Sequence, residues 1–300
     1  MKISSEHLGS LAALGAGIIW GLLGFFVREL DAMGITPMQM TCMRYIIMTI
    51  CVTAFILYKD RGLFVIGKRW LMVFLVMGIV GTILNSVCYF SSMSMISLSL
   101  AAVLQYDAPF IVILLSVPIL KERLTTRKLL AVVIAFTGCV LCTGVFTAEG
   151  PLDLWGIFIA AFSGFCFSLY TIGSKVVSSE GCSVPTVLFY TSLICVLGLA
   201  PFCDLPSALE LTFSDPAILA LIVGTGFFVT LLPFVLFNYS LEKIEAGKAS
   251  IITYVETIAA TVVGFLVYNE TIGIESAIGI LLILIALIMI NRRSPDRSGE

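Results

Sequence analysis

Charged residues are scarce in this 300-residue chain. Only 12% of the residues are Asp, Glu, Lys or Arg, whereas 59% are apolar and the mean hydropathy is +1.10. An average soluble protein has roughly 25% charged residues. The net charge of -2 provides no bulk attraction to nucleic acid, so we expect no nucleic-acid partner. Lipid is the expected solvent, and in lipid only helices or a closed barrel pair every backbone polar group.

Histidine and the common catalytic motifs are also nearly absent. His7 is the only histidine, which excludes histidine-based metal clusters and Ser-His catalysis within the membrane. The CxxC of Cys139 and Cys142 has no second copy, and most cysteines lie in apolar runs that are typical of packing. We therefore predict neither a metal nor a cofactor. HExxH, GxSxG and Gly-Asp do not occur either, so an intramembrane enzyme, including an aspartyl protease, is the disfavoured alternative.

What the chain does have is long apolar runs without alternating polarity. A helix needs about 20 apolar residues to cross a hydrocarbon core, whereas a barrel strand needs about 10 that alternate in polarity. The runs therefore predict an all-α membrane protein with ten transmembrane helices. We expect them at residues 9–28, 37–58, 70–92, 98–120, 128–147, 153–174, 184–204, 216–240, 248–268 and 273–290.

The positive charges of the loops predict the orientation of these helices. An even number of spans puts both termini on one side. Fifteen of the 17 Lys and Arg residues then fall on the side of the termini, Arg28 alone falls on the other side, and Arg44 falls inside a helix. We therefore predict cytoplasmic termini and a location in the cell (inner) membrane.

The two halves of the chain resemble each other. Residues of the first helix match residues 147 positions later, and from Pro37 onward the offset is 148. Each half contains five predicted helices, and an odd number makes the second copy enter the membrane in the opposite direction, as in alternating-access carriers. We predict two inverted repeats, 1–148 and 149–292, and a cytoplasmic tail, 293–300. The pairs include Trp20 with Phe167, Pro37 with Pro185, Ala101 with Ala249, Tyr106 with Tyr254, and Glu122 with Glu270.

These features resemble the EamA-type, ten-helix branch of the drug/metabolite transporter superfamily over nearly the whole chain. The resemblance is carried by Trp20-Gly21, Arg44-Tyr45, the Ala-rich fourth and ninth helices, Pro109, and Glu122 with Glu270. It implies a 5+5 inverted repeat around a central cavity and the transport, usually export, of small metabolites, amino acids or drugs. Two positions depart from the family pattern. Thr257 stands where the ninth helix of the family often has a proline, so the sequence predicts no kink at this point of the ninth helix. Asp107 replaces a residue that is more usually uncharged.

Three ionisable residues lie deep in the predicted membrane, where such groups are costly and mark function or pair with each other. Counted at 1.5 Å per residue, Arg44 and Asp107 lie about 10 Å and about 13 Å below the outer face. They either form an ion pair that joins the second and fourth helices, or face the cavity to hold a charged substrate or a proton. Glu256 has no basic residue at its depth and is the first candidate for proton coupling, with Asp107 as the second.

Other residues complete the predicted site. Polar and aromatic side chains suit a cavity wall, and prolines within helices free backbone carbonyls and provide bending points. Glu122 ends the fourth helix among basic residues, whereas Glu270 ends the ninth without any nearby in sequence. The predicted substrate-binding residues are Trp20, Arg44, Asn85, Tyr89, Tyr106, Asp107, Tyr170, Asn238, Tyr239 and Tyr254, and the predicted gate or structural residues are Pro109, Glu122, Pro233 and Glu270.

We thus predict a secondary-active transporter that exports small metabolites, such as amino acids or drug-like amines, by alternating access, with protons as the candidate coupling ion. Its expected partners are a small-molecule substrate, lipid and protons. A passive channel or facilitator is the remaining alternative, although the sequence shows no ring of like charges. The sequence does not indicate an oligomeric state.

Overall fold

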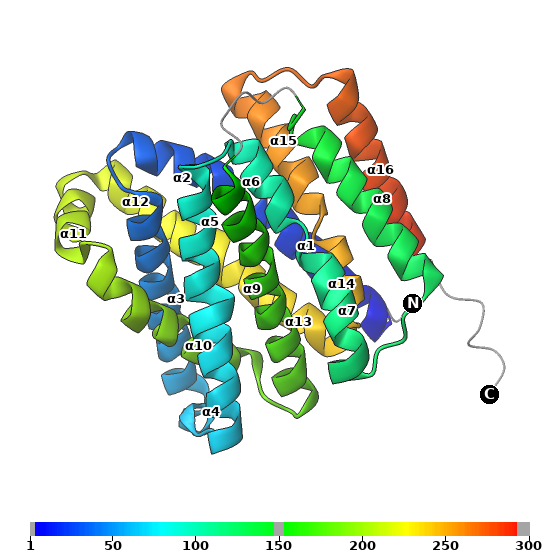
Figure 1. Ribbon diagram of the computed structural model, residues 1–300. Coiled ribbons are helices and arrows are strands. Elements are labelled where there is room, and N and C mark those ends of the chain that lie inside the picture. Colours follow the sequence, from blue (N-terminus) through cyan, green and yellow to red (C-terminus); the bar gives the residue numbers. More distant parts are fainter. Residues whose placement is uncertain (1–3, 147–152, 293–300) are drawn as a thin grey trace.

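The computed structural model describes residues 4–146 and 153–292. Within these ranges all regular structure is helical (Figure 1). Nine helical stretches are long and apolar enough to cross a membrane, and α8 (Thr126–Cys142), with 17 residues, is slightly shorter. These stretches correspond to the ten predicted spans. The tail predicted at 293–300 and the repeat boundary predicted at 148 lie outside the described residues.

Several spans are interrupted or bent. The first five are α1 with α2 (Ser5–Trp20, Leu23–Ala32), α3 (Pro37–Lys59), α4 with α5 (Lys68–Leu75, Asn85–Met93, joined by the π-helix Val76–Leu84), α6 with α7 (Leu98–Gln105, Ala108–Leu120), and α8. The second five are α9 (Leu154–Ser179), α10 (Val184–Leu199), α12 with α13 (Pro216–Gly224, Leu232–Lys243, joined by the π-helix Thr225–Leu231), α14 with α15 (Ala246–Ile252, Val255–Tyr268), and α16 (Ile274–Asn291). Short 3₁₀ turns occupy Arg61–Phe64 and Ala200–Phe202.

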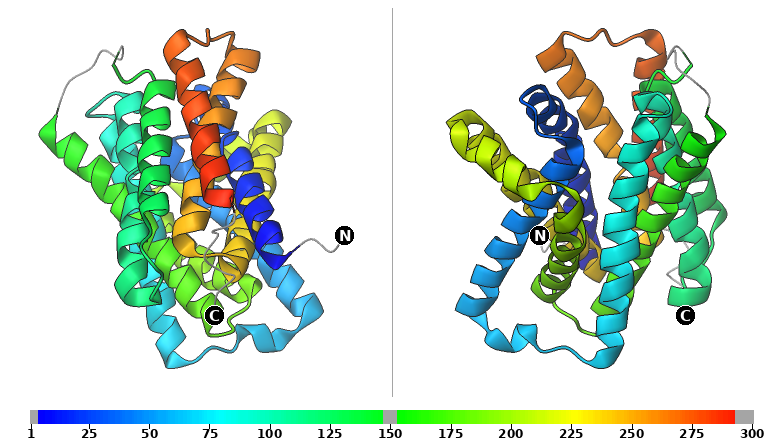
Figure 2. Two further views of the ribbon diagram at one scale, coloured as in Figure 1. Left: turned by 90° about the vertical axis from the view of Figure 1, so that its right-hand side faces the viewer. Right: turned by 60° about the vertical axis from the view of Figure 1, so that its left-hand side comes forward.

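One helix was not expected from the sequence. The connection predicted between residues 204 and 216 contains α11 (Leu205–Ser214). Its buried Ala208 joins a small apolar cluster with Met40 and Met43 of α3, and Figure 2 shows α11 beside the α12 end of the bundle. A segment of ten residues is too short to span a membrane, so the hydropathy pattern alone did not reveal it.

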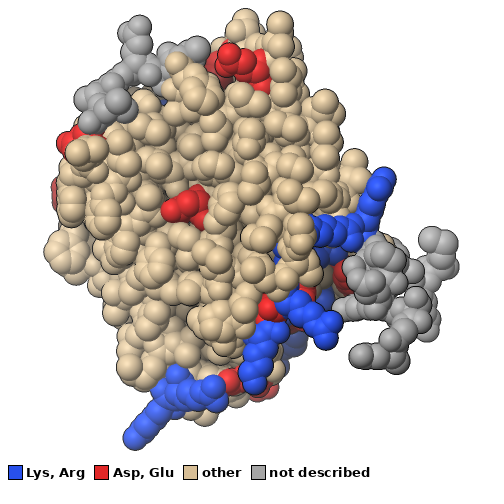
Figure 3. Space-filling view, turned by 45° about the vertical axis from the view of Figure 1, so that its right-hand side comes forward, with Lys and Arg blue, Asp and Glu red and all other residues tan. Residues whose placement is uncertain are grey.

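The charges separate the two ends of the bundle. We call the end at which α1, α4, α8, α10 and α14 begin the basic end, and the other the opposite end. Figure 3 shows Lys and Arg side chains gathered along one edge of the molecule, whereas the adjoining face is largely uncharged apart from one small acidic patch near its middle. An uncharged belt between polar edges is what a bilayer requires of a membrane protein.

The two repeats make matching contacts. A Cβ on Gly9 of α1 would lie 2.7 Å from Lys243 and 3.0 Å from Ile244. Gly156 of α9, which is 147 residues later, would meet Met95 and Ile96 at 2.8 and 3.0 Å. Both sets of partners are related by the 148-residue offset. The resemblance between the halves is therefore expressed in the packing of the spans.

The fifth and tenth spans pack directly on each other. α8 and α16 lie side by side along one edge of the bundle (Figures 1 and 2). A Cβ on Gly138 would lie 2.6 Å from the Gly279 carbonyl oxygen, and one on Gly279 would lie 2.5 Å from the Gly138 oxygen. Such mutual approach of two backbones is possible only with small residues at the crossing.

The fourth and ninth spans break at repeat-related positions, which corrects two expectations. Pro109 lies not inside a helix but in the first turn of α7, where a missing N–H costs nothing, whereas Pro233 lies, as predicted, inside the continuous helical stretch Pro216–Lys243, directly after its π-helix. The second half also breaks, at Thr253–Tyr254 between α14 and α15, although Thr257 stands where a proline is frequent. The Tyr254 hydroxyl donates to the Tyr106 carbonyl oxygen at 2.7 Å, so the two breaks meet.

Candidate functional site

A cavity of about 410 Å³ lies between the two repeats. This volume is within the range of small-molecule sites. Spans 1–4, 6, 8 and 9 contribute to its wall, and α8, α10 and α16 contribute no described residue to it. Of the predicted substrate residues, seven line it: Trp20, Arg44, Asn85, Tyr89, Tyr106, Tyr170 and Tyr254. Glu256, Pro109 and Glu270 line it as well.

The cavity wall carries a cation and an anion from different repeats. Arg44 of α3 stands beside Tyr45, with its guanidinium carbon 5.3 Å from the ring centroid. Its Nε is buried without a hydrogen-bond partner, and none of the ion pairs among the described residues includes it. Glu256 reaches the cavity from the first turn of α15. A buried donor without a partner is costly, so the Arg44 guanidinium stands at the cavity wall with hydrogen-bonding capacity that the described residues do not use.

Asp107 lies elsewhere. It precedes α7 and is not part of the cavity wall, whereas its neighbours Tyr106 and Ala108 are. Its carboxylate is packed against Gly164 of α9, where even a methyl group would collide with it, and Oδ1 is buried without a hydrogen-bond partner. In the described part of the chain no ion pair joins Asp107 to Arg44. The predicted ion pair between the second and fourth spans is therefore not formed.

Aromatic rings close the cavity toward the basic end. The Trp20 ring centroid lies 5.4 Å from that of Phe234 and 6.2 Å from that of Phe167, and Tyr170 lies 5.4 Å from Phe234. Edge-to-face pairs at these distances are favourable in addition to their area burial. Asn238 lies behind this floor, not in the cavity. It donates to the Tyr170 hydroxyl at 2.9 Å and to the Phe234 carbonyl at 2.8 Å, so it fixes the floor.

Of the remaining predicted substrate residues, some make contacts that fix their position in the cavity wall, and one lies outside the cavity. Asn85 donates to the Ser163 carbonyl at 2.8 Å, which ties α5 to α9. The Tyr106 and Tyr254 rings meet edge to face, 5.9 Å apart. Tyr239 is not among the lining residues. Its ring lies under the Lys243 ammonium, 5.2 Å away.

Below the floor, the basic end is closed by buried charges. Glu122 accepts the N–H groups of Ala246 and Gly247, at 2.6 and 3.4 Å, at the start of α14. Lys128 lies 3.5 Å from Glu122 and 3.0 Å from Glu245. The Glu122 and Lys128 side chains are only 6% and 7% exposed. The predicted local ion pair at Glu122 is present, but the carboxylate also joins the two repeats.

Lys175 adds a second link at the same end. This residue of α9 donates to the Leu241 and Ile244 carbonyl oxygens, at 2.5 and 2.9 Å. These carbonyls end α13, so their unpaired lone pairs are the natural partners of a cation. The contact joins α9 to the turn that precedes α14, and sequence reasoning did not identify it.

The opposite end is open and carries the counterpart of this arrangement. Glu270 lacks basic neighbours in sequence but pairs with Arg28 of α2 at 2.8 Å, which corrects the expectation that it has no base nearby. The Arg28 guanidinium also stands 4.6 Å above the Tyr268 ring. The side chains of Arg28 and Glu270 are 48% and 52% exposed, and all three residues line the cavity. Extending the 147-residue offset pairs Arg28 with Lys175, a signal that was available in the sequence.

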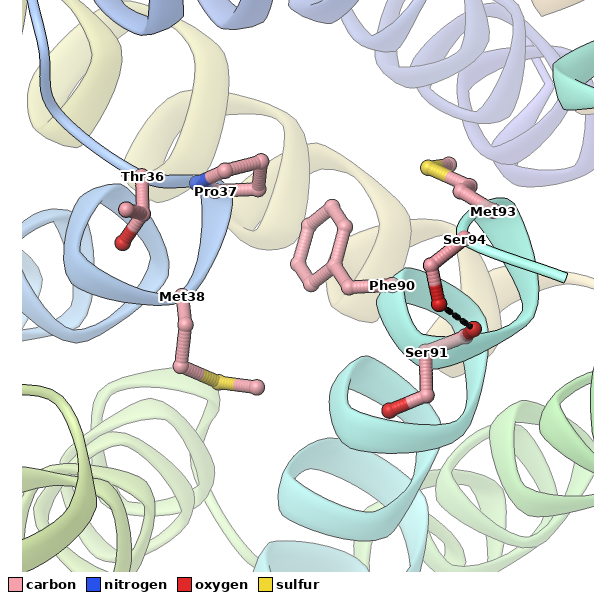
Figure 4. A pocket seen from close by; sticks show the side chains of 7 residues that line it. All are labelled: Thr36, Pro37, Met38, Phe90, Ser91, Met93 and Ser94. Atoms are coloured by element: carbon pink, nitrogen blue, oxygen red, sulfur yellow. Dashed lines mark hydrogen bonds between the residues drawn. The ribbon is translucent and has the colours of Figure 1, made fainter.

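A shallow groove adjoins this mouth. It lies between the start of α3 and the end of α5, and Figure 4 shows Phe90 pointing from α5 toward Pro37. Phe90 and Met93 belong to the walls of both the groove and the cavity. The remaining groove residues are Thr36, Met38, Ser91 and Ser94.

Comparison with known proteins identifies the family. The sequence pattern of the EamA-like transporter family matches twice, at residues 7–144 and 154–292. The chain belongs to the EamA-like transporter family. Its similarity to a Bacillus subtilis protein named "Uncharacterized transporter YetK" is 25% identity over 97% of this chain and 90% of that one. Escherichia coli K12 has an "Uncharacterized inner membrane transporter YhbE" that is 26% identical over 65% of this chain and 62% of its own.

A solved crystal structure supports the same fold. It covers 94% of this chain and 96% of its own, with a TM-score of 0.79 at 17% identity. Together, the two family matches and the ten-span bundle show a multi-pass membrane transporter of two repeats, and not an enzyme. The roles predicted for individual residues of the cavity remain predictions.

Proposed function

We propose that this EamA-family transporter carries a small amphipathic metabolite, such as an amino acid or a drug-like amine, by alternating access. The observation that carries the proposal is the cavity with Arg44 and Glu256 on its wall. A cation and an anion contributed by opposite repeats suit a zwitterion, and the aromatic rings between them suit an apolar side chain. An amine without a carboxylate would use Glu256 and the rings alone.

The proposed orientation follows from the charges. The basic end is cytoplasmic by the positive-inside rule, so both termini are cytoplasmic and the cavity opens to the outer side of the inner membrane. Export is the direction that the family resemblance implies. In this proposal the structure is the state that releases an exported substrate, since the floor and the buried charges separate the cavity from the cytoplasmic side.

Protons are the proposed driving ion. Glu256 in the cavity and Asp107 against Gly164 lie in the interior of their spans, and neither has a basic partner in the described ion pairs. A carboxylate in a low-dielectric medium is costly when it is charged and without a partner. Uptake of a proton by either acid would therefore couple the state of the cavity to the proton gradient.

The test begins with cells that overproduce the protein, plated on toxic amino-acid analogues and cationic drugs. A compound to which they become resistant then serves as the labelled probe in proteoliposomes. Arg44→Gln should abolish saturable counterflow of a zwitterionic probe, and Glu256→Gln should raise the probe concentration needed for half-maximal counterflow and remove the response to a pH gradient. Arg61→Gln and Glu275→Gln, at exposed positions, are the matched controls. Non-saturating flux without counterflow would instead establish a channel, and an unchanged pH response in Glu256→Gln would remove Glu256 from proton coupling.

A further inference from the structure

The two ends of the bundle contain equivalent groups in different arrangements. The chain turns that carry Glu122 and Glu270 are the same: Lys121 and Asn269 both adopt the left-handed conformation, with φ of 57° and 54°. The glutamate N–H groups close these turns onto Ser116 and Gly264 carbonyl oxygens, at 3.2 and 3.1 Å. Each pair is related by the 148-residue offset. The local sequence therefore presents the two carboxylates in the same way.

Their partners nevertheless differ. Glu122 reaches the start of α14, at Ala246 and Gly247. The residues related to these by the repeat are Leu98 and Ser99, at the start of α6. Glu270 does not bond to them: its carboxylate lies over Gly264 of its own helix and pairs with Arg28.

The basic residues show the same difference. Lys175 donates to the carbonyls of Leu241 and Ile244, whose repeat-related counterparts are Met93 and Ile96. Arg28 is the counterpart of Lys175, yet it contacts the Glu270 carboxylate and the Tyr268 ring. Met93, Leu98, Arg28 and Glu270 all line the cavity. The contacts that close the basic end are thus not formed at the opposite end. There the cavity separates Glu270 and Arg28 from the equivalent partner groups.

We infer that the protein changes access by exchanging these two equivalent closures. In the state that opens at the basic end, Glu270 accepts the N–H groups of Leu98 and Ser99, and Arg28 donates to the carbonyls of Met93 and Ile96. Glu122 and Lys175 release their own partners in the same step. This inference rests on the proposed alternating access, and it assigns Arg28 and Glu270 as the latch of the outer gate.

The two closures should be similar in free energy. A carboxylate bound by two N–H groups at a helix start is favoured by the helix dipole and by charge-assisted hydrogen bonds. Because both ends carry the same set, one closure replaces the other at little net cost. Exchange between two states of similar free energy is the condition under which a substrate or a proton can select between them.

The first test measures access to the cavity from outside. A cysteine is introduced at Val263, which lines the cavity, and its reaction with a membrane-impermeant maleimide is followed in intact cells against the parent chain. Glu122→Gln should slow labelling by up to about tenfold, because the loss of a hydrogen bond to a charged group shifts a two-state equilibrium by about that factor. Glu270→Gln should not slow it, and the double variant should return toward the parent rate. Glu275→Gln is the matched carboxylate control.

The second test measures how closely the helices that form each closure approach each other. A Cβ on Gly247 would lie 3.9 Å from the Ile113 Cα, so cysteines at positions 113 and 247 should form a disulfide in the present state under a mild oxidant. Cysteines at the equivalent positions, 261 and 99, should form one only weakly, and the yield should rise when Glu122→Gln or Lys175→Met is added. Disulfide-linked peptides are quantified by mass spectrometry in protein that elutes as a single peak on gel filtration.

Three results would overturn the inference: slowed labelling in Glu270→Gln, no recovery in the double variant, or no rise of the 99–261 disulfide with either added substitution. None of these measurements needs a transported compound. A failure of the proposed substrate or of proton coupling would leave the labelling and disulfide patterns intact, and the two failures are therefore distinguishable.

Discussion

The contact between α8 and α16 allows a quantitative prediction about the fold. A Cβ on Gly138 would lie 2.6 Å from the Gly279 carbonyl oxygen, whereas close carbon–oxygen contacts between helices are about 3.3 Å or longer. Gly138→Ala therefore forces the two helices apart by about 0.7 Å at their crossing. Overpacking of this kind costs about 1–3 kcal/mol, while alanine in place of glycine in a helix contributes up to about 1 kcal/mol in the other direction.

Gly15→Ala is the matched control for this substitution. Gly15 also lies inside a helix, but its added Cβ would meet only the end of the Leu236 side chain, at 3.4 Å. The gain in helix propensity then cancels in the comparison. We expect Gly138→Ala to have a free energy of unfolding about 1–3 kcal/mol below that of Gly15→Ala, measured by denaturant titration of the purified protein in detergent micelles.

The double variant Gly138→Ala, Gly279→Ala tests whether these two glycines contact each other. Once Gly138→Ala has separated the helices, Gly279→Ala meets a contact that is already relieved, so its additional cost should be smaller than its cost alone. Equal stability of Gly138→Ala and Gly15→Ala would show that α8 and α16 do not cross at these residues. The inverted pairing of the fifth and tenth spans would then be wrong.

Two further substitutions test the hydrogen bonds around the cavity. Asn238→Ala removes the donor to the Tyr170 hydroxyl and the Phe234 carbonyl behind the floor, and we expect a loss of about 1–3 kcal/mol because buried groups lose their partner. Unchanged denaturant resistance would contradict this role. Tyr254→Phe removes the hydroxyl that donates to the Tyr106 carbonyl and should cost about 0.5–1.5 kcal/mol in the same assay, whereas a gain in stability would show that the bond joining the two helix breaks is not formed.

Some of the local structure followed from the sequence with good accuracy. The end of α15, for example, was expected at residue 268 and lies at Tyr268, and the start of α12 was expected at Pro216 and lies there. The boundaries of a membrane span can be predicted from the sequence, because a span must be apolar for about 20 residues and cannot leave backbone groups unpaired. α11 was not predicted, because a short helix outside the spans need not have the length or the apolar composition of a membrane span.

Contacts between distant residues were much less predictable. The sequence placed Arg44 and Asp107 at similar depth, but depth says nothing about the direction in which a side chain leaves its helix. Asp107 turns to Gly164 of α9 and Arg44 turns to the cavity. In the same way, Glu270 was judged by its neighbours in sequence, whereas its partner, Arg28, is 242 residues away.

The sequence by itself determined the solvent, the number of spans and the presence of two related halves, because each of these depends on composition and spacing along one chain. The tertiary structure decided which end of the bundle is closed. Glu122 and Glu270 occupy the same position in their repeats and the same kind of turn, yet one is buried against α14 and the other is half exposed at the mouth of the cavity. Only the packing of one repeat against the other distinguishes them, and that packing differs at the two ends although the local sequences are alike.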